Sequence, residues 1–534
     1  MNAARPREDA VLGARAVRAL VRSGVLRPRR PRTTKGAFTA VRQHGPGAAA
    51  FTAMWAAIRP EATALIDDDG SMTWAELNAS AGAIATGLAE TCRAGPELGV
   101  AIMCRNHRGF VRAVAAAAHL GADLLLLNTD FPAPQLSQAL DRYELAAIVA
   151  DAEFAPVIAA SGFSGPVVVA DSPNAGGSMS LEAMAAGPIR LQPRPERPGR
   201  TTILSSGTTG APKGAGRALG RRAMITPFVT LQERIGLRSG EPMLIGPPLF
   251  HGFGLSFLMM SLFLGCPVVI SRRFDPAAAL ASIERERVTC VIGVPLMLQR
   301  LLTAAGEPDT SSLHAVVSAG APLAGHVATA FMDRFGDVVF NAYGSSETGF
   351  GSLADPAQLR RAPGTVGTTP LGVAVRILDD QMALAPAGQV GHIFIGSELV
   401  FDGYDGGGSK DMVAGLMNTG DLGHFDASGL LFIDGREDDM IVSGGENVFP
   451  QEVEDLLASH PDVADATVLG VPDAEFGQRL KAFVVTESGS APSDTELLGH
   501  VKEHLARYKV PREITFVEEI PRTPTGKVLR RLLG

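Results

Sequence analysis

Short apolar runs alternate with helix-like stretches along the first half of the chain and predict a layered fold. A hairpin over 63–74 leads into a helix from Ala75 to about Cys92, and another helix follows Asn106. The apolar runs are expected to be strands at 100–103, 124–127 and 146–150. Strands that alternate with helices indicate a parallel sheet wrapped by helices.

A second alternating series predicts another helix-wrapped sheet. Its strands are expected at 243–245, 268–270, 290–293, 315–318 and 338–341. From about Gly364 the pattern changes to short strands and glycine turns, which predicts a β-rich module. A small α/β unit follows Gly435, with helices expected at 452–459 and 494–507 and strands at 466–469 and 482–486.

Length and composition narrow the class of protein. A chain of 534 residues is too long for one core and should divide into domains. We predict a basic extension over 1–45, a large α/β domain over 46–435 and a small α+β domain over 436–534.

The net charge of −8 argues against nucleic-acid binding. The uncharged run 253–270 is broken by a Gly-Cys-Pro turn, so we expect a buried helix and strand there instead of a membrane span.

Cysteine spacing and the amino-terminal pattern bear on location. The cysteines Cys92, Cys104, Cys266 and Cys290 lack the spacing of a metal site or a disulfide framework, which favours a reducing cytoplasm. No secretory signal peptide is expected, because a compact apolar core and cleavage site are missing from the pattern.

The first 43 residues carry many arginines but only two acidic residues, Glu8 and Asp9. On a helix, Arg15, Arg18 and Arg22 share one face and Val17, Leu20 and Val21 share another. One hypothesis is an interfacial helix that makes a peripheral membrane contact. The alternative is a cationic tail that packs on the acidic body or stays disordered.

A loop rich in hydroxyls and glycines over 205–214 is the strongest local sign of chemistry. Glycines let backbone amides curl toward a polyphosphate, and the hydroxyls and one ammonium add further donors. The donors and glycines are Ser205, Ser206, Gly207, Thr208, Thr209, Gly210 and Lys213. The common P-loop is excluded, because Lys213 follows Ala-Pro and precedes Gly214. A flexible surface linker is the alternative interpretation.

Three further segments gain meaning beside such a loop. In the segment 341–349, Tyr343 can stack on a purine and Glu347 can offer a carboxylate to Mg²⁺, although a surface turn is the alternative for Glu347. Asp421 and Arg436 lie on glycine turns, and a carboxylate suits a ribose diol. His251 lies in a Pro- and Phe-rich segment typical of a gated carboxylate pocket, with a structural histidine as the alternative.

Lysine usage points to two positions. Only seven lysines occur among the 48 basic residues. A chain that prefers arginine so strongly retains Lys213 and Lys527 where a compact ammonium is required. Lys527 follows Pro524 and Gly526, which form a turn able to carry the amine into a cleft, and a basic tail residue is the alternative.

Taken in order, these motifs resemble the adenylate-forming superfamily of acyl-CoA synthetases, luciferases and non-ribosomal adenylation domains. The resemblance covers about residues 50–534 and rests on the segments 205–214, 343–347, 419–423, 435–454 and 521–527. The segments 104–110 and 127–129 and the basic extension are similar to actinobacterial fatty-acid–CoA ligases. The resemblance implies a two-step ligase that uses ATP, Mg²⁺ and CoA and activates a medium- or long-chain fatty acid.

The resemblance also implies roles for individual residues. Lys527, Glu347 and His251 are the candidate catalytic residues, and Glu347 with Thr208 would hold Mg²⁺. Candidate ATP and AMP contacts, besides the loop residues named above, are Gly320, Ala321, Pro322, Asn341, Tyr343, Gly344, Ser345, Ser346, Asp421 and Arg436. Asp438 would be the hinge of a mobile C-terminal domain, and Ser443, Gly444 and Gly445 would face CoA.

Several alternatives stay open at this point. The acid could be an aryl or bile acid, or the acceptor could be an acyl carrier protein, although the insertion typical of such relatives is not seen near the hinge. A non-catalytic lipid-binding paralogue is a third alternative. Two departures from the family pattern are Ser346, where threonine is usual, and 415–418, which lacks the usual aromatics and puts domain packing in doubt.

Overall fold

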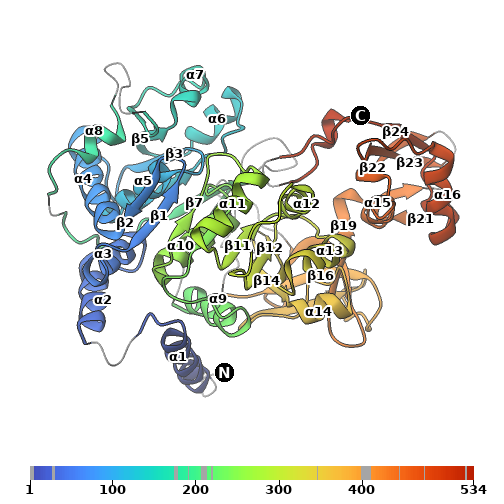
Figure 1. Ribbon diagram of the computed structural model, residues 1–534, viewed down its shortest axis with the longest axis horizontal. Coiled ribbons are helices and arrows are strands. Elements are labelled where there is room, and N and C mark those ends of the chain that lie inside the picture. The colour runs from blue at the N-terminus through green and yellow to red at the C-terminus, as the bar shows by residue number, and fades with distance from the viewer. Residues whose placement is uncertain are drawn as a thin grey trace. The chain divides into compact units, whose positions relative to one another are not determined.

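The computed structural model describes residues 5–26, 31–172, 179–190, 192–205, 213–217, 221–345, 347–398, 411–443, 446–473, 476–523 and 526–533. The chain forms two compact units (Figure 1), each considered by itself below. Unit 1 comprises Met1–Gly293, Thr303–Val317 and Glu398–Ser409. Unit 2 comprises Val294–Leu302, Ser318–Ser397 and Lys410–Gly534.

One sheet of unit 1 has six strands in the order β6-β5-β3-β4-β7-β8. The strands are β3 (Gly99–Met103), β4 (Leu124–Leu126), β5 (Leu145–Ala150), β6 (Val167–Val169), β7 (Thr201–Ser205) and β8 (Lys213–Arg217). All neighbouring pairs are parallel except β7 and β8. The helices α4 (Trp74–Cys92), α5 (Arg108–Leu120) and α6 (Ala133–Leu140) lie between strands in the chain. The predicted alternation is therefore present, with each of the three expected strands within one residue of its predicted bounds.

A second series of strands in unit 1 has the order β12-β11-β9-β10-β1-β2. It comprises β1 (Thr63–Asp67), β2 (Gly70–Thr73), β9 (Met243–Ile245), β10 (Val268–Val269), β11 (Cys290–Gly293) and β12 (Ala315–Ser318). The uncharged run forms helix α10 (Gly252–Leu264) and strand β10, as expected from its Gly-Cys-Pro turn. Among the described residues, no helix is both long enough and apolar enough to cross a membrane.

The basic extension forms helix α1 (Arg5–Arg22), which packs against helix α9 (Arg221–Arg234) within unit 1 (Figure 1). Arg15 forms an ion pair with Glu233, which raises the pKa of the arginine through a hydrogen bond. Arg222 donates to Asp9 at 2.8 Å. This arrangement matches the alternative in which the tail packs on the acidic body. The helices α2 (Pro31–His44) and α3 (Ala48–Ile58) follow.

In the central part of unit 2, strand β13 (Val339–Ser345), predicted over 338–341 as the last strand of the second series, pairs antiparallel with β14 (Gly349–Ala354). The expected β-rich module follows them in the chain. A separate antiparallel sheet contains β15 (Ala374–Leu378), β16 (Gly391–Gly396), β17 (Met412–Val413), β18 (Leu416–Phe425) and β19 (Leu431–Arg436). Helices α12 (Pro295–Thr303), α13 (Gly325–Phe335) and α14 (Pro356–Arg361) belong to the same unit.

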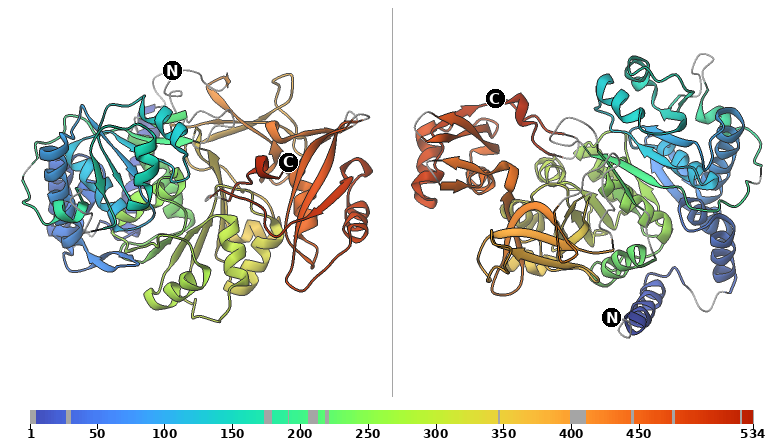
Figure 2. Two further views of the ribbon diagram at one scale, coloured as in Figure 1. Left: turned by 90° about the horizontal axis from the view of Figure 1, so that it is seen from above. Right: turned by 180° about the vertical axis from the view of Figure 1, so that it is seen from behind.

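The C-terminal part of unit 2 packs helices α15 (Pro450–Ala458) and α16 (Asp494–His504) on a five-stranded sheet. The strands are β20 (Ile441–Ser443), β21 (Glu446–Val448), β22 (Val463–Asp473), β23 (Gly477–Thr486) and β24 (Glu513–Phe516). The sequence predicted only the centre of β22 and the C-terminal half of β23. Gly470 and Pro472 interrupt the apolar pattern of β22, and Gln478 and Arg479 interrupt that of β23. Figure 2 shows these long strands near the red end of the chain.

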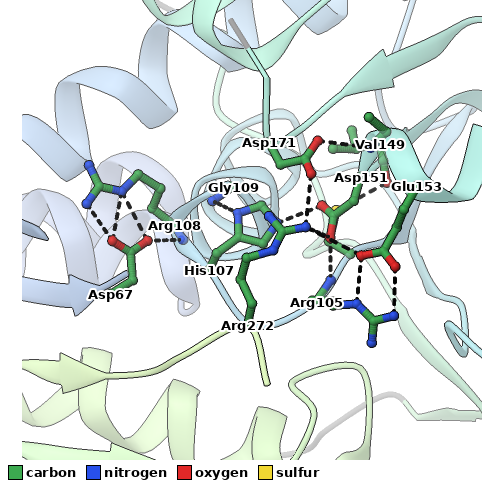
Figure 3. Close-up of polar contacts among 12 residues, drawn as sticks. Asp67, Arg105, His107, Arg108, Gly109, Val149, Asp151, Glu153, Asp171 and Arg272 are labelled. Carbon is green, nitrogen blue, oxygen red and sulfur yellow. Dashed lines mark hydrogen bonds and ion pairs between the residues drawn. The ribbon is translucent and has the colours of Figure 1, made fainter. Parts of the chain in front are cut away.

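A buried polar network connects the two sheets of unit 1 (Figure 3). Asp151, which follows β5, has a fully buried side chain and accepts hydrogen bonds from His107 Nε2 at 2.6 Å and from the Arg105 amide at 2.9 Å. Arg272, which follows β10, reaches Asp151 at 3.2 Å and Asp171 at 2.9 Å. The positive charge of Arg272, which follows a strand of one sheet, thus neutralises the carboxylates of Asp151 and Asp171, which follow strands of the other sheet.

Removing the central carboxylate should destabilise unit 1. We expect Asp151→Ala to lower the free energy of unfolding by about 3–5 kcal/mol, because it leaves buried partners uncompensated. Urea denaturation followed by tryptophan fluorescence measures this unit, since both tryptophans, Trp55 and Trp74, are buried in it. The control is Glu153→Gln, whose side chain is 38% exposed and whose loss should be below about 1 kcal/mol. Equal losses for the two variants would contradict a structural role for Asp151.

Candidate active site

A tyrosine, a carboxylate and a guanidinium meet in unit 2. The Tyr343 hydroxyl on β13 donates to Asp421 Oδ2 at 2.6 Å, and Arg436 Nη1 donates to Asp421 Oδ1 at 3.1 Å. Asp421 lies on β18 directly opposite Arg436 on β19 in the antiparallel register. The three residues are 78 and 15 positions apart in sequence, and the structure brings them into one cluster.

The backbone before Asp421 fixes the direction of its carboxylate. The Thr419 hydroxyl donates a hydrogen bond to the Ile393 carbonyl at 3.0 Å and accepts one from the Asp421 amide at 3.0 Å. Gly420 has φ +79°, which favours glycine, and its amide donates to Asn418 Oδ1 at 2.8 Å. The threonine and glycine of this motif are therefore needed locally to hold the aspartate.

The cluster is electrostatically coupled. Burial and the negative charge of Asp421 raise the pKa of the Tyr343 hydroxyl well above its usual value, so this hydroxyl stays protonated and acts as a donor. Burial lowers the pKa of Arg436, but Asp421, Asp438 and Asp439 outweigh it, so the net shift is upward. Arg436 also reaches the candidate hinge residue Asp438, with Nη2 3.5 Å from Oδ2.

Glu347 is held on a turn after β13. The Ser345 hydroxyl accepts the amides of Glu347 and Thr348, each at 3.2 Å. Gly344 has no space for a side chain, because an added Cβ would lie 2.0 Å from the Gly349 carbonyl oxygen. Glu347 is half-buried and offers one carboxylate. Mg²⁺ at nucleotide sites is usually held by one or two carboxylates together with phosphate oxygens, so this donor fits the ion.

Two other candidate nucleotide residues have local structural roles. Asn341 is buried on β13, and its Nδ2 donates to the Thr365 carbonyl at 3.0 Å. Gly320 has φ +91° in the segment after β12 that continues through Ala321 and Pro322. A Cβ added to Gly320 would lie 3.6 Å from Val294 Cγ1, in ordinary contact.

The turn that carries Lys527 is strongly organised. The Gly526 amide donates to the Thr523 carbonyl at 2.8 Å, and the Thr523 amide donates to the Lys527 carbonyl at 2.8 Å. Arg522 holds this turn from the side. Its Nη2 donates to Asp465 Oδ1 at 2.8 Å, and its Nη1 donates to the Gly526 carbonyl at 2.9 Å.

One valine connects this turn to the candidate adenine segment. A Cβ added to Gly526 would lie 3.8 Å from Val294 Cγ2 and 3.7 Å from Leu296 Cβ. A Cβ added to Gly320 would lie near the same valine, as described above. Within unit 2, the Lys527 turn and the Gly320 segment therefore both lie near Val294.

His251 belongs to unit 1, where it precedes α10. Its ring centroid lies 4.6 Å from that of Phe250, and its amide donates to the Pro248 carbonyl at 3.1 Å. Asn106 holds this loop, because its Nδ2 donates to the Pro247 carbonyl at 2.9 Å and its Oδ1 accepts the Leu249 amide at 2.8 Å.

Part of the candidate site lies outside the described residues. These positions are Ser206, Gly207, Thr208, Thr209, Gly210, Ser346, Gly444 and Gly445. Ser205 and Lys213 are paired across the antiparallel strands β7 and β8, and the structure describes only their backbone. Ser443 ends β20 and pairs with Glu446 and Gly477. The functional roles predicted for all these residues stay predictions.

Sequence reasoning did not identify Arg522, Asp465 or Asn106 as parts of the site. Arg522 and its partner Asp465 are 57 residues apart, and nothing local relates them. The Pro-Arg-Thr-Pro-Thr-Gly-Lys motif does contain Arg522, so its closeness to Lys527 was the one available signal.

The layered α/β architecture, the smaller C-terminal part and the ordered nucleotide motifs together define an adenylate-forming enzyme as the class of protein. The family model described as AMP-binding enzyme matches residues 52–405, and that of the AMP-binding enzyme C-terminal domain matches residues 452–527. The chain belongs to the AMP-binding enzyme family. Adenylate-forming CoA ligases use ATP, CoA and Mg²⁺, as predicted.

The alignments with similar proteins extend over nearly the whole chain. A feruloyl-CoA synthase from Amycolatopsis sp is 32% identical over 493 residues, which span 89% of this chain and 96% of the relative. A 2-succinylbenzoate–CoA ligase from Geobacillus kaustophilus is 34% identical over 490 residues, 89% of this chain and 95% of the relative. The structure of the anthranilate CoA ligase AuaEII with anthranoyl-AMP has a TM-score of 0.82 at 26% identity and covers 91% of this chain and 96% of that one. These matches confirm the predicted fold class.

The contacts of Arg522 give a testable positioning role. We expect Arg522→Ala to slow adenylation by about 10- to 100-fold, because the turn that carries Lys527 loses its lateral support. Arg522→Lys should not restore the rate, since an ammonium cannot replace the fork of the guanidinium. The measurement is acid-dependent pyrophosphate release, with kcat and KM determined separately.

Arg479→Ala is the matched control, because this arginine on β23 forms an ion pair with Glu513 and is 38% exposed. Thioester formation from supplied acyl-adenylate should change little in Arg522→Ala. Full activity of Arg522→Ala would exclude the positioning role.

Proposed function

We propose that the chain activates an aromatic carboxylic acid with ATP and transfers the acyl group to CoA. The names of the relatives support this substrate class, since feruloyl, 2-succinylbenzoyl and anthranoyl groups are all aromatic. The fatty acid expected from the sequence is not supported by these relatives. The aryl-acid alternative fits them better.

The observation that carries the proposal is the cluster in unit 2. The carboxylate of Asp421 is held between a phenol and a guanidinium. Such a carboxylate can still accept a hydrogen bond from each of the two hydroxyls of a ribose. The Tyr343 ring is fixed by its hydroxyl and can cover one face of a purine. Gly526 in the Lys527 turn and Gly320 in the candidate adenine segment both lie near Val294.

In the first step, an oxygen of the acid attacks the α-phosphorus, and the bond to the leaving pyrophosphate breaks. Lys527 would place its ammonium on the acid and the α-phosphate, where negative charge develops. Mg²⁺, when bound, neutralises charge on the phosphates, and Glu347 would hold it. Asp421 and Arg436 would fix the ribose during this step.

In the second step, the thiol sulfur of CoA attacks the acyl carbonyl carbon, AMP leaves with the electron pair of the broken bond, and the thiol loses its proton. We propose that the small C-terminal domain rotates about Asp438 between the steps, which withdraws Lys527 and presents the Ser443 segment. The domain bounds 46–435 and 436–534 belong to this proposal.

Aromatic side chains around His251 support an aromatic acid. Phe250 is buried against the His251 ring, and Phe253 contacts Phe257 edge-on, with the ring centroids 5.5 Å apart. Phe253 is the partly exposed phenylalanine of this group, and its ring face suits an aryl group. Asn106 braces the loop that leads to Phe250 and His251.

A panel of acids tests the proposal. Pyrophosphate release should be measured with ferulate, 2-succinylbenzoate, anthranilate, octanoate and palmitate, each with and without CoA. We expect kcat/KM for at least one aromatic acid to exceed that for both fatty acids by about 10-fold or more. A fatty acid as the best substrate would overturn the aromatic assignment. Release of pyrophosphate without thioester formation would indicate another acceptor, such as a carrier protein. If none of the acids caused pyrophosphate release, the ligase assignment would be overturned.

We further propose that the protein acts in the cytoplasm and that α1 supports α9 without binding a membrane. The four cysteines are free and buried, as suits a reducing compartment. Arg15 and Asp9 of α1 are both paired with residues of α9. Sedimentation with anionic liposomes should therefore be the same for the full chain and for a chain that starts at Gly45. Loss of sedimentation on truncation would support the membrane alternative.

A further inference from the structure

Three of the eleven histidines gather at the C-terminal part of unit 2. His460 follows α15, while His500 and His504 lie on α16. The ring centroids of His460 and His500 are 5.2 Å apart, and those of His500 and His504 are 4.8 Å apart. The proposed reaction uses none of these residues.

Two carboxylates complete the group. Asp462 Oδ2 lies 3.8 Å from His460 Nδ1, and Glu496 Oε1 lies 4.0 Å from His460 Nε2. One ligand atom from each of these three residues lies within 4.8 Å of the others. The side chains are 11%, 38% and 55% exposed for His460, Asp462 and Glu496, so the group opens to solvent on one side.

We propose that His460, Asp462 and Glu496 bind a divalent transition-metal ion, with Zn²⁺ as the natural occupant and His500 as the nearest further imidazole. The 4.0 Å separation of Nε2 and Oε1 is too long for a hydrogen bond. In tetrahedral Zn²⁺ coordination, two ligand atoms each about 2.0–2.1 Å from the ion lie about 3.4 Å apart, so the exposed Glu496 side chain would move slightly toward His460 on binding. Imidazole with carboxylate selects zinc, nickel or copper over Mg²⁺.

Rigid elements hold the ligands. Glu496, His500 and His504 follow one another at four-residue intervals, which places them on one side of α16. The neighbouring face of the helix is anchored in the core by Leu497 and Val501, both fully buried. A helix fixed by its apolar face presents its ligands without a further ordering cost.

Hydrogen bonds orient the ligands from outside. The Ser490 hydroxyl donates to Asp462 Oδ1 at 2.7 Å. The Asp462 amide donates to His460 Nδ1 at 3.3 Å, so Nε2, which faces Glu496, carries the proton of the neutral ring. Binding an ion at Nε2 would move this proton to Nδ1 and break that long hydrogen bond. His500 Nε2 donates to the Leu456 carbonyl at 3.3 Å, so its Nδ1 carries the lone pair. Such outer contacts are typical of metal sites, where they fix ring orientation.

The other group of ligand-type residues, Cys104, His107 and Asp151, differs in two respects. All three are buried, and the carboxylate already accepts the Arg272 guanidinium. Both nitrogens of His107 are also engaged, Nδ1 by the Gly109 amide at 3.1 Å and Nε2 by Asp151. A cation there would have to displace an arginine, so we assign the ion to the solvent-open group on α16.

Zinc titration of the full, metal-free chain in millimolar Mg²⁺ tests the assignment, with a chromophoric chelator as competitor. We expect one Zn²⁺ per chain and a rise in the thermal midpoint on binding. His460→Gln should weaken binding by about 10- to 100-fold, and Glu496→Gln, which changes a side chain that is 55% exposed, should weaken it by about 10-fold. His326→Gln on α13 is the matched control and should leave binding unchanged.

Absence of stoichiometric Zn²⁺ binding would overturn the assignment. So would equal affinities for the parent chain, His460→Gln and Glu496→Gln, because the ion would then bind elsewhere. Since the readout is metal binding, the result does not depend on whether the proposed acid–CoA ligase reaction is correct.

Discussion

Replacing Lys527 with alanine is expected to slow acid-dependent pyrophosphate release by about 100- to 1000-fold, the cost of removing one donor that stabilises charge in a transition state. Thioester formation from supplied acyl-adenylate should be largely retained, because the lysine would be withdrawn in that step. Measuring the two half-reactions separately, with the same enzyme preparation, distinguishes these effects.

Lys502→Ala is the matched control for this experiment, since Lys502 is exposed on α16 of the same unit. Its rates should stay close to those of the parent chain in both half-reactions. If Lys527→Ala lost both half-reactions equally, the alternation of two domain positions would be contradicted. Unchanged pyrophosphate release would contradict the catalytic role itself.

Replacing Asp421 with alanine should lower kcat/KM for ATP by at least about 100-fold, mainly through KM. A hydrogen bond to a charged group contributes about 1.5–3 kcal/mol, and this carboxylate would make two with the ribose. Tyr343→Phe keeps the ring and removes only the hydroxyl, so its loss should be smaller, about 10-fold. Initial rates at varied ATP concentration give both values.

Asp380→Ala serves as the control for Asp421→Ala, because the Asp380 side chain is 99% exposed on the same unit. An unchanged KM for ATP in Asp421→Ala would show that this carboxylate does not hold the ribose. A larger loss in Tyr343→Phe than in Asp421→Ala would instead assign the main role to the phenol.

The apolar pattern predicted elements whose neighbours are mainly local. Strands β9, β11 and β12 have the expected bounds, because each is a short buried run between clear turns. The predicted strands are shorter than β22 and β23, because the outer residues of this hairpin are held by backbone pairing with the partner strand and are not part of an apolar run. Tertiary pairing thus extended strands that the pattern alone would have ended early.

The candidate site residues that lie in short sequence motifs could be predicted. Tyr343, Asp421 and Arg436 were chosen from separate segments, and the structure places them within hydrogen-bonding distance. Arg522 was missed, because its importance depends on Asp465 and on the Gly526 carbonyl. The acid could not be chosen either, since a substrate pocket is a surface built from many distant residues.

Arg436 joins two parts of the machinery that are otherwise separate. One of its nitrogens donates to the carboxylate that we propose binds the ribose, and the other faces Asp438, the proposed hinge. Under these proposed roles, a change in hinge angle would alter the charge beside the nucleotide, and the nucleotide would alter the charge at the hinge. By reciprocal linkage, the affinities for ATP and AMP should both depend on the position of the C-terminal domain. The same domain equilibrium would then set both the release of AMP and the binding of the next ATP.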